Sequence, residues 1–187
     1  MSTGLIEYGD IKDKPFKLVL NEILESSKLN YGNLNVLDLQ LRKLPAIKIH
    51  QKWEHEVFGF GVYIFFDDKV PVYAGKADSN FKHRFQSHRY FDGRLKYAFN
   101  ELARKTAVNK LGSLDLALKK DSFYGIVIPE VEKFDVVRIN LLGSGLSNKK
   151  CSRLENLFRK GYYETLYNGM AVVKEYNAES NLSDLMM

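Results

Sequence analysis

Residues 59–76 read GFGVYIFFDDKVPVYAGK, and this stretch decides what fold we expect. From Phe58 to Phe66 every residue is aromatic, β-branched or glycine, which is typical of a buried strand. The letters DDK at 67–69 predict a turn, and VPVYAG at 70–75 predicts an antiparallel return strand. Because Pro71 has no backbone N–H to donate, it favours the start of a strand or the edge of a sheet. The stretch therefore predicts a β-hairpin.

Helical patterns flank this hairpin. Residues 13–28 repeat apolar side chains at helical spacing, with Asp13 as a cap and Pro15 in the first turn. A second helix is expected over 81–91, capped by Asp78, Ser79 or Asn80. Two further amphipathic helices are expected over 94–107 and 149–167.

Other segments are expected to complete the sheet. The β-rich runs FYGIVIP (123–129) and FDVVRINLL (134–142) predict that at least one more strand joins the hairpin. Residues 35–50 alternate leucines with polar residues, which fits a strand, although a leucine-rich segment could equally be helical. The polar C-terminal residues 168–187 are expected to be irregular or loosely packed.

These elements predict one α/β (α+β type) fold: a small, largely antiparallel three-stranded sheet flanked by helices, with an N-terminal helical extension. We expect residues 1–57 to form that extension and to pack on the core. Residues 58–170 then form the main domain, and 171–187 form a tail.

Charge and cysteine content limit the class of protein. The 187 residues include 28 Lys and Arg against 23 Asp and Glu, giving a net charge of +5 that favours a polyanionic partner. The single cysteine, Cys151, excludes an internal disulfide and fits a reducing compartment, so a cytoplasmic location is expected. The N-terminus shows no secretory signal, and no apolar run is long enough for a membrane span.

The sequence lacks the motifs of several common kinds of catalytic or metal-binding site. The four histidines, at 50, 55, 83 and 88, do not have zinc-site spacing. The glycines of GSGLSNKK (143–150) do not have the spacing of a phosphate-binding P-loop, and no GxSxG serine-hydrolase motif occurs.

What remains is an ordered series of residues, which runs Gly61-Val62-Tyr63, Tyr73-Ala74-Gly75, Arg84 with His88 one helical turn later, Glu155, and Asn168. This series resembles the GIY-YIG nuclease superfamily, in which two such triplets lie on adjacent strands and Arg, Glu and Asn follow in order. Lys76, directly after the second triplet, also resembles members of that superfamily. The resemblance spans residues 61–168, a little over half of the chain.

The resemblance implies a metal-dependent phosphodiesterase. Glu155 would hold Mg²⁺ (or Mn²⁺), since this cation binds few carboxylates and keeps most of its waters. Arg84 would bind phosphate oxygens with its guanidinium group, which is permanently charged and can donate two parallel hydrogen bonds. Taken singly, Glu155 would read as an exposed helix carboxylate and Arg84 as a surface ion pair.

The remaining landmarks would act on the water and the phosphate. The resemblance implies that Tyr63 is the general base, although a tyrosine pKa of ~10 requires a neighbouring cation or a second proton acceptor. Tyr73 would orient the water or bind phosphate, and strand packing explains it nearly as well. His88 would share the proton transfer or bind phosphate. Lys76 and Asn168 are expected to contact phosphate, Asn168 with a positioning role near the metal.

The expected function is DNA endonuclease activity by a one-metal, water-mediated mechanism, in restriction or in phage DNA degradation. Double-stranded DNA is the expected substrate, and cutting both strands would need a homodimer or two visits. Three alternatives stay open at this point: a non-catalytic DNA-binding or scaffold protein with the same fold, a structure-specific repair nuclease, and an enzyme that cleaves RNA.

Overall fold

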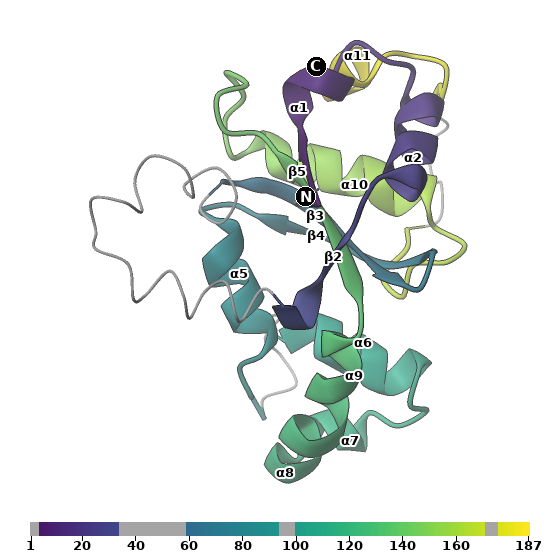
Figure 1. Cartoon of the computed structure of the whole chain (residues 1–187). Coiled ribbons are helices and arrows are strands. Elements are labelled where there is room, and N and C mark those ends of the chain that lie inside the picture. Colours follow the sequence, from purple (N-terminus) through teal and green to yellow (C-terminus); the bar gives the residue numbers. More distant parts are fainter. Residues whose placement is uncertain (1–3, 34–58, 94–99, 171–175) are drawn as a thin grey trace, which may run out of the picture.

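A computed structural model of the chain describes residues 4–33, 59–93, 100–170 and 176–187, and shows a central sheet between two groups of helices (Figure 1). The five described strands are β1 (Leu5–Glu7), β2 (Leu29–Asn30), β3 (Gly61–Asp67), β4 (Val70–Ala77) and β5 (Asp135–Asn140). Their order is β1-β5-β3-β4, and β2 also pairs with β5. The expected combination of α-helices with a largely antiparallel sheet is confirmed.

The expected number of three strands is wrong, because β1 and β2 were missed. Strand β1 has three residues and runs parallel to β5, and β2 has two residues and runs antiparallel to β5. Segments this short show no alternation of apolar and polar side chains, so no periodic pattern could reveal them. Residues 4–33 therefore supply sheet strands as well as helix.

The predicted hairpin is confirmed. Strands β3 and β4 pair antiparallel from Gly61 opposite Ala77 to Asp67 opposite Val70. The connecting turn places Asp68 at a positive φ of 56°, a conformation that aspartate tolerates better than most residues. Pro71 lies near the start of β4, at the edge of the described sheet, where a residue without a backbone N–H is tolerated.

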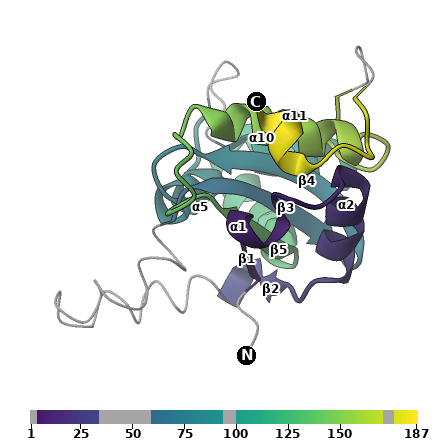
Figure 2. The same ribbon diagram turned by 90° about the horizontal axis from the view of Figure 1, so that it is seen from above.

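Helices cover both faces of the sheet (Figures 1 and 2). The first face carries α2 (Phe16–Glu25), α10 (Lys150–Gly161) and α11 (Leu182–Met186), which pack with the inward side chains of Val62, Ile64 and Phe66. The second face carries α5 (Phe81–His88), α6 (Glu101–Asn109) and α9 (Ile128–Glu132), which pack with Tyr63, Phe65 and Tyr73. The other short helical elements in the described residues are α1 (Tyr8–Ile11), α7 (Asp115–Leu118), α8 (Lys120–Ser122) and η3 (Phe123–Val127).

The two β-rich runs have different outcomes. Residues 134–142 contain β5, which confirms that at least one of the runs joins the hairpin, and the run at 123–129 forms the π-helical turn η3 and the start of α9. Phe123, Val127 and Val131 recur every four residues and are all buried, which is a helical arrangement. Residues 35–50 lie outside the described part of the chain.

Three helices are confirmed with different limits. Helix α2 begins at Phe16, directly after Pro15, and no side chain caps it, so the capping role expected of Asp13 is wrong. Helix α5 is capped by Asn80, whose side chain accepts a 2.7 Å hydrogen bond from the His83 N–H. Helix α10 ends at Gly161, earlier than the predicted 167.

The expectation of a loosely packed C-terminal tail is wrong for its described residues. Leu182 and Met186 are buried, and the backbone N–H of Phe16 donates to the Ser180 carbonyl at 2.9 Å. The Lys150 ammonium and the Arg153 Nε then donate to the carbonyls of Met186 and Leu185 at 2.6 and 2.7 Å. The tail thus closes one end of the core.

Shortening the buried side chain of Leu182 in the tail is expected to destabilise the protein. Leu182→Ala removes a fully buried leucine and should lower the free energy of unfolding by about 2–4 kcal/mol. Leu18→Ala is the matched control, because Leu18 is 53% exposed and should change stability little. Urea unfolding of both variants checks this expectation, which fails if the two variants have equal midpoints.

Within these four described segments, no helix combines the length and the apolar character that crossing a lipid bilayer requires.

Candidate active site

The hairpin and α5 bring the predicted aromatic and basic residues together. Alternation along β3 and β4 points Tyr63 and Tyr73 to the second face of the sheet, where their rings stack at a centroid distance of 6.4 Å. Helix α5 packs on this face, and its residues Arg84 and His88 lie one turn apart. Four of the predicted site residues, Tyr63, Tyr73, Arg84 and His88, therefore lie on one face of the sheet.

The hydroxyl of Tyr63 lies between two nitrogen groups of α5. Arg84 Nε donates to it at 2.9 Å, and His88 Nε2 lies 2.6 Å from it. Which partner of the second contact is the donor depends on the tautomer of the imidazole. Both Tyr63 and His88 are 0% exposed, so the contact between these two side chains is sealed within the core.

Burial governs the protonation of this group. Burial raises the pKa of Tyr63 above its ordinary value, and the adjacent Arg84 offsets only part of that rise. Burial, reinforced by the positive charges of Arg84 and Arg89, lowers the pKa of His88 well below its ordinary value. At neutral pH the pair is therefore a phenol beside a neutral imidazole.

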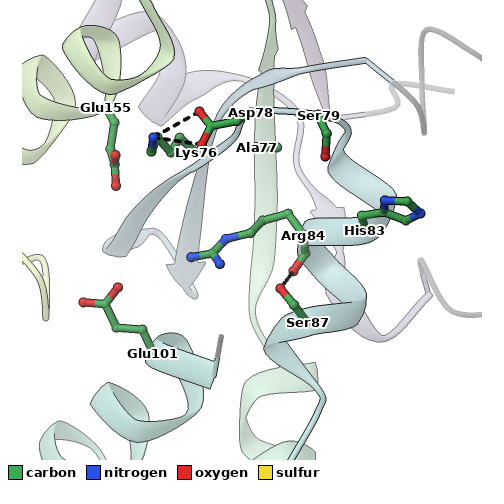
Figure 3. A pocket seen from close by; sticks show the side chains of 9 residues that line it. All are labelled: Lys76, Ala77, Asp78, Ser79, His83, Arg84, Ser87, Glu101 and Glu155. Carbon is green, nitrogen blue, oxygen red and sulfur yellow. Dashed lines mark hydrogen bonds and ion pairs between the residues drawn. The ribbon is translucent and has the colours of Figure 1, made fainter. Parts of the chain in front are cut away.

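A pocket of about 470 Å³ opens beside this group (Figure 3). Its described lining consists of Lys76, Ala77, Asp78, Ser79, His83, Arg84, Ser87, Glu101 and Glu155. Of the residues expected from the sequence, Lys76, Arg84 and Glu155 line the pocket, and they come from β4, α5 and α10. Tyr63, Tyr73, His88 and Asn168 are not part of the lining.

Lys76 is held in place on the wall of the pocket. Its ammonium lies 2.8 Å from the Asp78 carboxylate and donates to the Ser152 hydroxyl at 2.9 Å. Ser152 lies on α10 one turn before Glu155, so this bond fixes a cation near the predicted metal ligand.

Glu155 is half-buried on α10. Burial raises the pKa of its carboxyl, the nearby Glu101 adds to the rise, and Arg159, Lys76 and Arg84 act in the opposite direction. A carboxylate whose charge is disfavoured in this way gains from a bound cation, because the cation stabilises the charged form.

Glu101, the first residue of α6, was not among the predicted site residues. It lines the pocket, and its Oε2 accepts a 2.9 Å hydrogen bond from the Tyr73 hydroxyl. Burial raises the pKa of Tyr73 well above its ordinary value, so that hydroxyl stays a donor. In the sequence Glu101 is one acidic residue on an amphipathic helix, and no motif distinguishes it from a solvated one.

Asn168 is hydrogen-bonded to the edge strand β4. Its amide nitrogen donates to the Ala74 carbonyl at 2.6 Å, and its amide oxygen accepts from the Ala74 N–H at 3.2 Å. Arg159 Nε donates to the Asn168 carbonyl at 2.7 Å. With its amide bonded to Ala74 on both sides, Asn168 has a structural position that links β4 to α10.

Gly75 allows Tyr63 to lie against β4. The two residues are opposite in the ladder, and a Cβ at position 75 would meet the hydroxyl oxygen and ring carbons of Tyr63 well inside contact distance. The glycine of the second triplet is therefore required by the tyrosine of the first.

We expect Gly75→Ala to displace the Tyr63 ring and to lower the free energy of unfolding by about 1–3 kcal/mol. Gly9→Ala is the control, because a Cβ at Gly9 meets no atom within 4 Å. Guanidinium unfolding of both variants is the measurement. Wild-type stability in Gly75→Ala would contradict the packing described here.

Comparisons of the chain with family models, with curated proteins and with solved structures find no match. Among the described residues, no group of three or more His, Cys, Asp and Glu is arranged to hold a metal ion. A cation with few protein ligands still fits the site, because Mg²⁺ commonly binds one or two carboxylates and keeps several waters. The described lining of the pocket therefore combines the half-buried Glu155 with the cations Lys76 and Arg84 and with the further carboxylates of Asp78 and Glu101.

Proposed function

We propose that this protein is a metal-dependent DNA endonuclease that hydrolyses phosphodiester bonds, of the kind that the GIY-YIG resemblance implies. One observation carries the proposal: Lys76, Arg84 and Glu155, which come from the three elements β4, α5 and α10, line one pocket. Two cations and a metal-binding carboxylate are the groups that phosphodiester hydrolysis needs around its phosphate.

Arg84 binds the phosphate in this proposal. Burial alone would lower the pKa of the guanidinium, but the hydrogen bond to Tyr63 and the nearby Glu101 carboxylate act in the opposite direction and the pKa is raised, so Arg84 stays charged. Its Nε is committed to Tyr63, which leaves the terminal N–H groups to donate to phosphate oxygens. Lys76 adds a second positive charge from strand β4.

Glu155 would hold the cation. Mg²⁺ or Mn²⁺ bound there supplies positive charge to the phosphate and its leaving oxygen. Lys76 neutralises part of the carboxylate charge in the free protein, and its bonds to Asp78 and Ser152 keep the ammonium beside Glu155.

Tyr63 and His88 act through Arg84. Because their contact lies behind the guanidinium and both side chains are fully buried, we assign them a positioning role instead of the base role that the resemblance implies. The Tyr63 hydroxyl fixes Arg84 Nε, and His88 fixes that hydroxyl. These two contacts keep the guanidinium of Arg84 in one orientation for binding phosphate.

DNA is the proposed substrate, since the net charge of +5 favours a polyanion. A role in restriction or in phage DNA degradation is the setting we propose, with double-stranded DNA cut one strand at a time at a single site.

End-labelled oligonucleotides test this proposal. Duplex DNA, single-stranded DNA and RNA of one sequence are incubated with the protein in Mg²⁺, in Mn²⁺ and in EDTA. We expect the duplex to be cut in both metals and to stay intact in EDTA. Cleavage of RNA alone would overturn the DNA assignment, and equal cleavage in EDTA would overturn the metal-dependent mechanism.

A further inference from the structure

Two carboxylates enter the candidate pocket from different helices. Glu155 projects from α10 and Glu101 from the start of α6, and in the view of Figure 3 both carboxylates lie on the same side of the Arg84 guanidinium, one above its level and one below it. Phosphoryl transfer places the attacking and the leaving oxygen roughly in line, on opposite sides of phosphorus. A phosphate bound by Arg84 would therefore present one of these oxygens toward each carboxylate.

A proton acceptor for the attacking water has to be open to the pocket. Tyr63 and His88 are fully buried and do not line it, whereas Glu101 does. The Tyr73 hydroxyl donates to Oε2 of Glu101 at 2.9 Å, which holds the carboxylate in one orientation. A carboxylate has two oxygens and about four lone-pair sites, so this bond leaves capacity for a water.

We infer that Glu101 is the general base of this site, a catalytic residue that takes the proton of the attacking water. The inference rests on the proposed nuclease function. In the reaction the water oxygen forms a bond to phosphorus as its proton passes to the Glu101 carboxylate. The bond from phosphorus to the leaving oxygen breaks, and that oxygen takes a proton from solvent. Tyr73 is then a positioning residue, which aims Glu101.

Glu101→Gln tests the inference, because glutamine keeps the size and an oxygen that accepts from Tyr73 but cannot serve as the base. Single-turnover cleavage of a labelled duplex in saturating Mg²⁺ is expected to slow by ~10²–10⁴-fold. Duplex affinity in Ca²⁺ and calorimetric binding of Mg²⁺ are expected to stay at wild-type values. Glu101→Asp keeps the charge and withdraws it by one methylene, so its rate should fall between those of wild type and Glu101→Gln.

Two comparisons separate the base from other roles. Tyr73→Phe removes the bond that aims Glu101 and should slow cleavage far less than Glu101→Gln. Equal losses would overturn the base role, since they would make Glu101 a support for Tyr73. Recovery of Glu101→Gln by excess Mg²⁺ would also overturn it, because Glu101 would then be a metal ligand.

The inference and the proposed function fail in different ways. A wild-type protein that cuts no nucleic acid refutes the proposed function. A wild-type protein that cuts, with a Glu101→Gln variant that cuts at the same rate, refutes only the base role. If Glu101→Gln does not fold, Glu101→Asp decides, and a wild-type rate in that variant is the contradicting result.

Discussion

Glu155→Gln is expected to abolish Mg²⁺ binding and to slow DNA cleavage by at least ~10³-fold. The amide has nearly the shape of the carboxylate but lacks the charge that a hard cation requires. The substitution also removes a carboxyl whose charged form is disfavoured by burial, which is the first cause of its raised pKa. The folded protein should consequently be no less stable than the wild type without metal.

Calorimetric titration with Mg²⁺ and single-turnover cleavage are the two measurements for Glu155→Gln. Glu164→Gln is the control, since Glu164 is exposed and does not line the pocket. It should bind Mg²⁺ and cut DNA like the wild type. If Glu155→Gln still bound Mg²⁺ with wild-type affinity, the metal site would have to lie elsewhere.

Arg84→Lys is expected to slow cleavage by ~10²–10³-fold. Lysine keeps the charge but loses the fork that can donate to two phosphate oxygens while Nε bonds to Tyr63. The Tyr63 hydroxyl would also lose a partner at a fully buried position. The variant should therefore be less stable by about 1–3 kcal/mol.

Arg153→Lys is the matched control for the cleavage rate, because Arg153 is exposed and does not line the pocket. Cleavage rates and thermal unfolding are measured for both. A loss of stability in Arg84→Lys with an unchanged cleavage rate would assign Arg84 a purely structural role.

The elements with strong local patterns could be predicted from the sequence. The hairpin of β3 and β4 has a run of strand-forming residues and a clear turn, and α5 has an Asn80 cap and a Phe81–Phe85 apolar face. The π-helical turn η3 could not be predicted, because its β-branched residues favour a strand locally and only tertiary packing makes it helical. The packing of the tail likewise depends on long-range bonds from Lys150 and Arg153.

The candidate site also has a part that could be predicted from the sequence and a part that could not. The family resemblance pointed to seven residues, of which the fold brings Lys76, Arg84 and Glu155 to the lining of one pocket. Two features of the site depend on three-dimensional packing, which the order of residues along the chain does not reveal. Arg84 covers Tyr63, and Glu101 reaches the pocket from a helix whose sequence has no recognisable motif. The role of Tyr63 is therefore better judged from its surroundings than from the resemblance.

The central claim is that this pocket cleaves DNA with a cation held by Glu155, and one plasmid assay tests it most directly. Supercoiled plasmid is incubated with equal amounts of purified wild-type protein and Glu155→Gln, in Mg²⁺ and in EDTA. The expected result is nicked and then linear DNA only with the wild type in Mg²⁺. Intact plasmid in every lane, or equal cutting by both proteins, would contradict the claim.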